Sequence, residues 1–296
     1  MNNRLSVKQN EPWWVRHGSM IDKVFGWLGL FCVMSGLIVL IVLGGQMVTQ
    51  GWSRLTWQFL TAFPSRDPAQ AGILSAWVGS VWVVGLSALF ALPLGVMTAI
   101  YLEEYAKRRR FAHWLEINIA NLAGVPSIIY GLLGLSLFVR FLALGRSVLA
   151  GAVTLSLLIL PIVILATREA LRAVPASLRE GSYALGATRW QTVWHQVLPA
   201  TAPGVLTGVI LSLSRAVGET APLIMIGALT YVAFLPQSVN DPFTVLPIQI
   251  FNWVSRPQEA FALNAAAGVI VLMGITLLMN GLAIWVRQRS THRLYR

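Results

Sequence analysis

Long apolar runs alternate with short polar segments along almost the whole chain. An uncharged run of about 18 residues or more is long enough to cross a bilayer as a helix. The runs of this kind are Val24–Met47, Gly72–Leu102, Ile119–Leu144, Val148–Thr167, Pro203–Leu229 and Phe261–Val286. The pattern therefore predicts an all-α integral membrane protein with six transmembrane helices.

The first run is too long for the apolar core of a signal peptide, and no small-residue cleavage site follows it. We therefore expect a polar N-terminal segment at 1–23 and a retained first span with its external loop at 24–71. Residues 72–286 would form the main transmembrane domain, which includes a polar segment at 168–202. Residues 287–296 would form a basic tail.

Basic residues are concentrated in every second polar segment. They are Arg4, Lys8, Arg16 and Lys23; Lys107, Arg108, Arg109 and Arg110; Arg168, Arg172, Arg179 and Arg189; and Arg287, Arg289, Arg293 and Arg296. The intervening loops hold only Arg54, Arg66, Arg146 and Arg256. Because an excess of Lys and Arg marks the cytoplasmic side, both termini are predicted to be cytoplasmic. The stretch Glu103–Asn118 is predicted to be an interfacial helix on anionic membrane lipid.

Composition narrows the possible functions. A mean hydropathy of +0.68 and only 11% charged residues exclude an ordinary soluble domain. The net charge of +11 follows the membrane topology, so no nucleic-acid partner is expected. The single cysteine, Cys32, excludes a disulfide framework and thiolate metal sites. The histidines lie outside the predicted spans without a carboxylate at metal-ligand or catalytic spacing, so we expect neither a metal site nor a catalytic site.

The polar segment 168–202 is predicted to fold, although it only connects two spans. Ser177–Glu180 and Thr188–Gln191 each fit a capping box, in which a hydroxyl and a carboxylate or amide satisfy the first amides of a helix. Gly186, between the two boxes, is a candidate left-handed helix terminator. We expect two short helices joined by a sharp turn, whose exposed apolar residues either contact a partner or lie on the membrane.

The run EGSYALGATRWQTVWHQVLP in this segment resembles the signature of ABC-importer permeases. The matching positions are Glu180, Gly186, Leu198 and Pro199, whereas Gly181 and Ser182 replace the two usual alanines. In that family the segment docks in a cleft of the ATPase subunit. The resemblance therefore implies a type I ABC-importer permease architecture with cytoplasmic coupling helices. The implied docking residues are Arg179, Glu180, Gly181, Ser182, Ala184, Leu185, Gly186, Leu198 and Pro199.

The chain has no phosphate-cradling P-loop, because its only lysines are Lys8, Lys23 and Lys107 and none stands in a Gly-Lys-Ser/Thr setting. We expect a transport subunit without a cofactor or enzymatic activity of its own. Its energy would come from a separate subunit or an ion gradient. In the family that it resembles, ATP and Mg²⁺ are bound by the partner ATPase.

Two ionisable residues lie inside the predicted fifth span. Arg215 and Glu219 are four apart, hence on one helical face and close enough to pair. Such charges cost several kcal/mol at bilayer depth, so they mark either a substrate pathway or a structural ion pair. An anionic substrate fits best, because a guanidinium matches oxyanion geometry. Arg140 is either an anion attractor at the entrance or an interfacial residue, and Arg168, with Glu169, either an exit gate or an ordinary helix-end pair.

Three further runs sharpen the resemblance: Gly124–Leu135, Ser214–Leu223 and Asp241–Trp253 look like PstA-type permeases of bacterial phosphate importers. The resemblance implies a bacterial inner-membrane subunit that forms half of the phosphate pathway. The implied partners are a PstC-like second permease, a PstB-like ATPase dimer and a PstS-like periplasmic phosphate-binding protein. Sulfate or molybdate import remains open, because charge arguments treat all oxyanions alike. An ion-coupled carrier would need more buried carboxylates, and a membrane-embedded hydrolase lacks a catalytic pairing.

Overall fold

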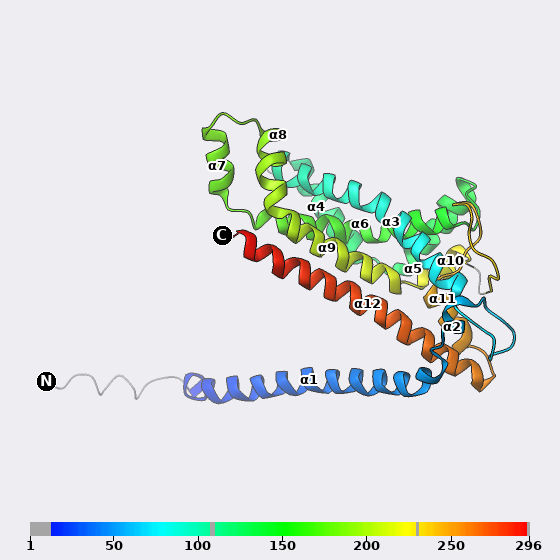
Figure 1. Ribbon diagram of the computed structural model, residues 1–296. Coiled ribbons are helices and arrows are strands. Elements are labelled where there is room, and N and C mark those ends of the chain that lie inside the picture. Colours follow the sequence, from blue (N-terminus) through cyan, green and yellow to red (C-terminus); the bar gives the residue numbers. More distant parts are fainter. Residues whose placement is uncertain (1–12, 107–109, 229–230, 295–296) are drawn as a thin grey trace. The chain divides into compact units, whose positions relative to one another are not determined.

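The computed structural model describes residues 13–106, 110–228 and 231–294 (Figure 1). The chain forms two compact units, residues 1–50 and residues 51–296. Residues 1–12 of the predicted N-terminal segment, and Lys107, Arg108 and Arg109 of the predicted basic stretch, lie outside the described residues.

The described part of the first unit is the long helix α1 (Trp13–Gly51) without its last residue, Gly51, which belongs to the second unit. The side chains of residues 22–42 are all exposed, and most of them are apolar. A helix that is apolar on every side is typical of a segment surrounded by lipid. The predicted first span is therefore confirmed as a helix.

The second unit is built around α3 (Leu74–Ile100) and α6 (Val148–Arg172), which pack together along much of their length. Mostly small residues line the buried face of α3 at intervals of four: Ser75, Gly79, Val83, Ser87, Ala91, Gly95 and Ala99. Residues four apart share one helix face, and small ones let two backbones approach closely. The Ser87 hydroxyl also donates to the Ala152 carbonyl oxygen of α6, at 2.9 Å.

Two more long helices extend this pair. α9 (Leu198–Gly218) packs on α6, and α12 (Glu259–Leu294) packs on α9. Gly208 of α9 lies so close to α6 that a Cβ there would come within 2.6 Å of the Ala166 Cβ. In the described part of the chain, five helices are long and apolar enough to cross a membrane, and a bent pair could supply a sixth span.

The predicted third span, Ile119–Leu144, is divided between two helices that meet at a sharp bend. α4 (Arg110–Ala123) and α5 (Ser127–Gly134) meet at an angle of 100°, and a π-helical turn, η4 (Leu135–Phe141), continues α5. The break falls at Gly124-Val125-Pro126, because Pro126 lacks an amide hydrogen and its ring disfavours a helical residue before it.

The prediction of an interfacial helix over Glu103–Asn118 is wrong at its start. Residues 101–105 continue α3 as a π-helical turn, η3 (Tyr101–Tyr105), and Glu103 is buried. A helix of this stretch is described only from Arg110 onward, as α4. The hydrophobic pattern predicts that Glu103 is exposed, because a carboxylate is normally solvated unless it is paired.

The fifth span also breaks, before its predicted end at Leu229. α9 ends at Gly218 with Glu219 as its extended C-cap, and a short helix, α10 (Ala221–Ile226), follows. Pro222 explains the break, because it cannot donate to the Gly218 carbonyl four residues earlier. The C-cap of α10 is Gly227, whose φ of +85° is left-handed.

Shorter elements close the end of this unit where α12 begins (Figure 1). They are η2 (Trp52–Arg54), α2 (Trp57–Thr61) and α11 (Leu246–Val254). The rings of Phe59 and Trp253, both almost fully buried, lie 5.8 Å apart there. At the other end, α7 (Ala176–Ala184), α8 (Arg189–Thr192) and the π-helical turn η5 (Val193–Val197) form a hairpin that runs directly into α9.

Gly131→Ala should destabilise the folded protein by about 1–3 kcal/mol, the usual cost of overpacking. A Cβ at this position would lie 2.6 Å from the Pro222 Cα, a backbone atom of α10. Gly85→Ala is the matched control, since nothing lies within 4 Å of a Cβ there. Thermal unfolding of both variants in detergent tests this packing, and equal midpoints would contradict it.

Candidate functional site

The hairpin between α6 and α9 turns at Gly186, as predicted. Its φ is +84°, a left-handed value that L side chains rarely adopt. The Gly186 amide donates to the Tyr183 carbonyl oxygen at 2.9 Å, and the Ala187 amide to the Ser182 carbonyl oxygen at 3.2 Å. This pair of bonds is a Schellman motif, which satisfies the last carbonyls of α7.

One of the two predicted capping boxes is confirmed. The backbone amide of Gln191 donates to the Thr188 hydroxyl oxygen at 3.3 Å, and the backbone amide of Thr188 donates to the Gln191 side-chain oxygen at 2.9 Å. The box at Ser177–Glu180 is wrong, because α7 starts two residues earlier than that box requires, with Pro175 and not Ser177 as its N-cap. Ser177 therefore lies inside the first turn, where its hydroxyl cannot cap.

Most of the predicted docking residues are exposed on this hairpin. On the hairpin itself, Ser182 is partly exposed, and the exposed ones are Glu180, Gly181, Ala184, Leu185 and Gly186. At the start of α9, Pro199 is exposed and Leu198 partly exposed. Leu185, an apolar residue beside the turn, is 91% exposed to solvent. A groove of about 690 Å³ runs between the two arms, lined by residues that include Gly181, Leu185 and His195. An exposed apolar tip beside a groove is suited to a protein partner.

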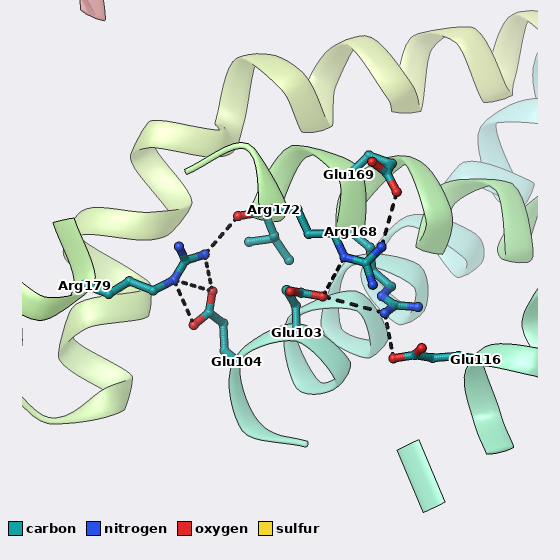
Figure 2. Close-up of polar contacts among 8 residues, drawn as sticks. Glu103, Glu104, Glu116, Arg168, Glu169, Arg172 and Arg179 are labelled. Carbon is teal, nitrogen blue, oxygen red and sulfur yellow. Dashed lines mark hydrogen bonds and ion pairs between the residues drawn. The ribbon is translucent and has the colours of Figure 1, made fainter. Parts of the chain in front are cut away.

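Arg179 is the exception, because its side chain is turned inward (Figure 2). Its Nε lies 3.1 Å and its Nη2 2.7 Å from Glu104 Oε1. Nη1 donates to the Val174 carbonyl oxygen at 2.8 Å and Nη2 to that of Leu171 at 2.9 Å. Arg179 thus satisfies carbonyls at the end of α6 while it neutralises Glu104. Its role in docking stays a prediction.

Arg168 lies in the same cluster of charges (Figure 2), and only 4% of it is exposed. Its Nη2 is 2.7 Å from Glu116 Oε1 of α4 and 3.6 Å from Glu103 Oε2. Arg172 Nε donates to Glu103 Oε2 at 3.1 Å, and Arg172 Nη1 pairs with Glu169 Oε1 at 3.5 Å. The cluster joins the ends of α3 and α6 to the middle of α4. It does not bring Arg168 to Glu169, the helix-end pair considered from the sequence.

The sequence interpretation missed Glu103, Glu104 and Glu116. A usable signal was present: the adjacent Glu103 and Glu104 follow directly on a predicted span, in a chain with only 11 acidic residues. Buried carboxylates need cationic partners, and the arginines of segment 168–202 are predicted to lie on the same side of the membrane as these glutamates.

Arg215 and Glu219 pair as predicted, although the helix ends between them. Arg215 Nε lies 3.4 Å from Glu219 Oε1, with the arginine side chain 60% and the glutamate side chain 15% exposed. The pair lies at the break between α9 and α10, where the Gly218 carbonyl oxygen accepts a bond from the Thr220 hydroxyl at 3.3 Å. Non-helical backbone at membrane depth is tolerated where it is buried in protein or lines an aqueous cavity.

Arg140, the fourth predicted pathway residue, is exposed in the last turn of η4. Among the described residues it has no hydrogen-bond or ion-pair partner, and neither it nor Arg168 contacts the Arg215–Glu219 pair. Within the same described ranges, no group of three or more His, Cys, Asp or Glu side chains is arranged to hold a metal ion.

Comparison with known proteins gives a family and a set of relatives. The model of the family "binding-protein-dependent transport system inner membrane component" matches residues 91–292. The phosphate transport system permease protein PstA 1 of Mycobacterium tuberculosis is 34% identical over 87% of this chain and 85% of its own length. The PstA protein of Yersinia pestis is 32% identical over 97% of this chain and 96% of its own length.

Solved structures share the fold. A chain of a bacterial alginate ABC transporter, crystallised with an alginate-bound periplasmic protein, superposes with a TM-score of 0.65 at 17% identity, covering 94% of this chain and 98% of its own. A chain of the inward-facing methionine transporter MetNI gives 0.59 at 18% identity, over 74% and 95%. With the family match over most of its length, this chain belongs to the inner membrane components of binding-protein-dependent transport systems.

Proposed function

We propose that this chain is the permease subunit of a phosphate importer in the bacterial inner membrane, where it forms half of the transmembrane pathway and docks the ATPase through Arg179–Pro199. The observation that carries the proposal is the similarity to phosphate permeases along nearly the whole chain. Membership in a family that works with binding proteins favours this mechanism over an ion-coupled carrier.

The hairpin supports the docking role. Its turn is held by the Schellman motif at Gly186 and by the capping box at Thr188, so its exposed tip keeps its shape without a partner. Because the hairpin continues through η5 into α9, a displacement of the tip is passed to the helix that carries Arg215.

The Arg215–Glu219 pair supports an anionic cargo. The exposed guanidinium is held only at 3.4 Å by the less exposed carboxylate, so an oxyanion with better geometry can compete for it. Glu219 would orient Arg215 in the empty pathway and release it when phosphate arrives. Exposed Arg140 would attract anions at the entrance, whereas Arg168, held by two carboxylates, would organise the cytoplasmic end.

The remaining machinery would lie on other chains. We infer a PstC-like second permease, a PstB-like ATPase dimer that binds ATP and Mg²⁺, and a PstS-like binding protein. The chain's lysines offer no P-loop for a nucleotide of its own.

Purification of the tagged chain should recover a second permease and an ATPase. In proteoliposomes supplied with the binding protein, ATP should drive uptake of labelled phosphate, with little uptake of sulfate or molybdate. The chain purified by itself should hydrolyse no ATP. A preference for sulfate or molybdate would contradict the assignment of phosphate as the substrate. Uptake driven by an ion gradient without ATP would contradict the ATP-driven mechanism.

Glu180→Lys should leave insertion intact but reduce phosphate uptake per ATP hydrolysed by about tenfold or more, because a reversed charge at the docking surface disturbs the coupling between two subunits. Glu259→Lys is the control, since it makes the same change at an exposed site at the start of α12. Parallel uptake and hydrolysis assays compare the two variants. Normal coupling in Glu180→Lys would remove the docking assignment.

Arg215→Gln should abolish phosphate uptake while the complex still assembles, because the amide cannot supply a charged, forked contact to an oxyanion. Arg289→Gln removes the same charge from the last part of α12, where the guanidinium lies over the Trp285 ring, and should transport normally. Uptake at the unaltered rate in Arg215→Gln would show that the ion pair is structural.

A further inference from the structure

We infer that Glu104 is a positioning residue for coupled transport: its ion pair with Arg179 ties the docking hairpin to α3, so that a displacement of the hairpin by the ATPase also moves α3. This inference rests on the proposed docking function and adds a residue that the docking motif does not include. It follows from how the hairpin is held.

The chain itself connects the hairpin to α6 and to α9, but not to α3. α7 follows α6 after Pro175, and η5 continues into α9. α7 has no fully buried residue, and Leu178 is its one side chain that packs against an apolar cluster, together with residues such as Leu171 and Val197. Apolar contact therefore holds α7 only weakly.

The apolar cluster that Leu178 packs against also holds Ala99 of α3 and Leu102 of η3. Arg179 adds a directional polar attachment to this apolar contact. Its guanidinium donates to both carboxylate oxygens of Glu104, to the Leu171 carbonyl in the last turn of α6 and to the Val174 carbonyl just after that helix. Because the planar guanidinium donates several hydrogen bonds at once, its orientation is fixed, whereas a single hydrogen bond would leave the side chain free to rotate. α7, the end of α6 and the end of α3 are thus joined through one side chain (Figure 2).

Glu104 is suited to this task by its burial and its position. Only 6% of its side chain is exposed, and Arg179 is its hydrogen-bond partner among the described residues. It lies on η3, the π-helical end of α3, next to Glu103, which binds Arg172 and Arg168 of α6. The two neighbouring carboxylates have separate partners: Glu103 fixes α3 to α6, and Glu104 fixes α3 to the hairpin.

When this link is broken, the hairpin keeps its own turn and its exposed tip, because the Schellman motif and the Thr188 capping box do not involve Glu104. The ATPase should therefore still bind and still hydrolyse ATP. What is lost is the transfer of its motion to α3, which forms the core with α6. The expected defect is hydrolysis without transport.

The test compares Glu104→Gln, Arg179→Gln and the double variant in the complete complex reconstituted with its binding protein. All three should retain the ATPase on purification, and all should lose phosphate uptake per ATP to the same extent, by about tenfold or more. Equal, non-additive losses identify two residues that act through one link. Glu169→Gln, which alters an exposed carboxylate of the same cluster, should stay near the unaltered ratio.

Other results overturn the inference in distinct ways. Normal coupling in Glu104→Gln shows that the pair transmits nothing. Loss of the ATPase from Glu104→Gln shows that Glu104 only maintains the docking surface. Additive losses, with the ATPase lost from Arg179→Gln alone, show that Arg179 contacts the ATPase directly. If the unaltered chain recovers no ATPase, the proposed function itself fails. Should Glu104→Gln not accumulate, Glu104→Asp keeps the charge and should show a smaller loss in the same ratio.

Discussion

The close contact between α3 and α6 determines where the functional groups of this protein can lie. Within a membrane, helices associate through packing and hydrogen bonds, since lipid tails are as apolar as the helix surfaces. Small residues at intervals of four on α3 provide that packing, and the bond from Ser87 to Ala152 adds to it. The same approach brings the end of α3 to the end of α6, so that Glu103 meets Arg172 at 3.1 Å. Without it, buried carboxylates would be left as unpaired charges, which is strongly destabilising.

Much of the fold was predictable because it depends on local patterns. The apolar runs predict the spans, and Gly186 and Thr188 predict the turn of the hairpin, since a left-handed residue and a capping box are properties of a few neighbouring residues. The size of the bend at Pro126 could not be predicted, because hydropathy carries no information about the direction of the backbone. The Glu104–Arg179 and Glu116–Arg168 pairs were missed because they join residues 75 and 52 positions apart. Nothing in either local sequence selects the partner.

Breaks in the helices place polar groups where continuous spans would hide them. The third span bends after Ala123, and the fifth ends at Gly218. Each break frees carbonyls that a continuous helix would use internally, and such groups must find protein or water partners. The Arg215–Glu219 pair lies beside the second break, so its charges and the freed backbone groups share one polar region. This arrangement agrees with the proposed pathway for an anion.

The arginines of the cluster also bear on how the chain enters the membrane. Arg168, Arg172 and Arg179 belong to a segment whose positive charge is predicted to keep it in the cytoplasm, and acidic residues contribute little to that decision. In the folded protein the same arginines are paired with Glu103, Glu104, Glu116 and Glu169. On the predicted topology, each arginine would act twice: as a free charge that sets orientation during synthesis, and as an ion-paired one once the helices have assembled. A neutral substitution here would affect biogenesis and the mature structure by separate routes, and an acidic partner removed by mutation would affect only the second.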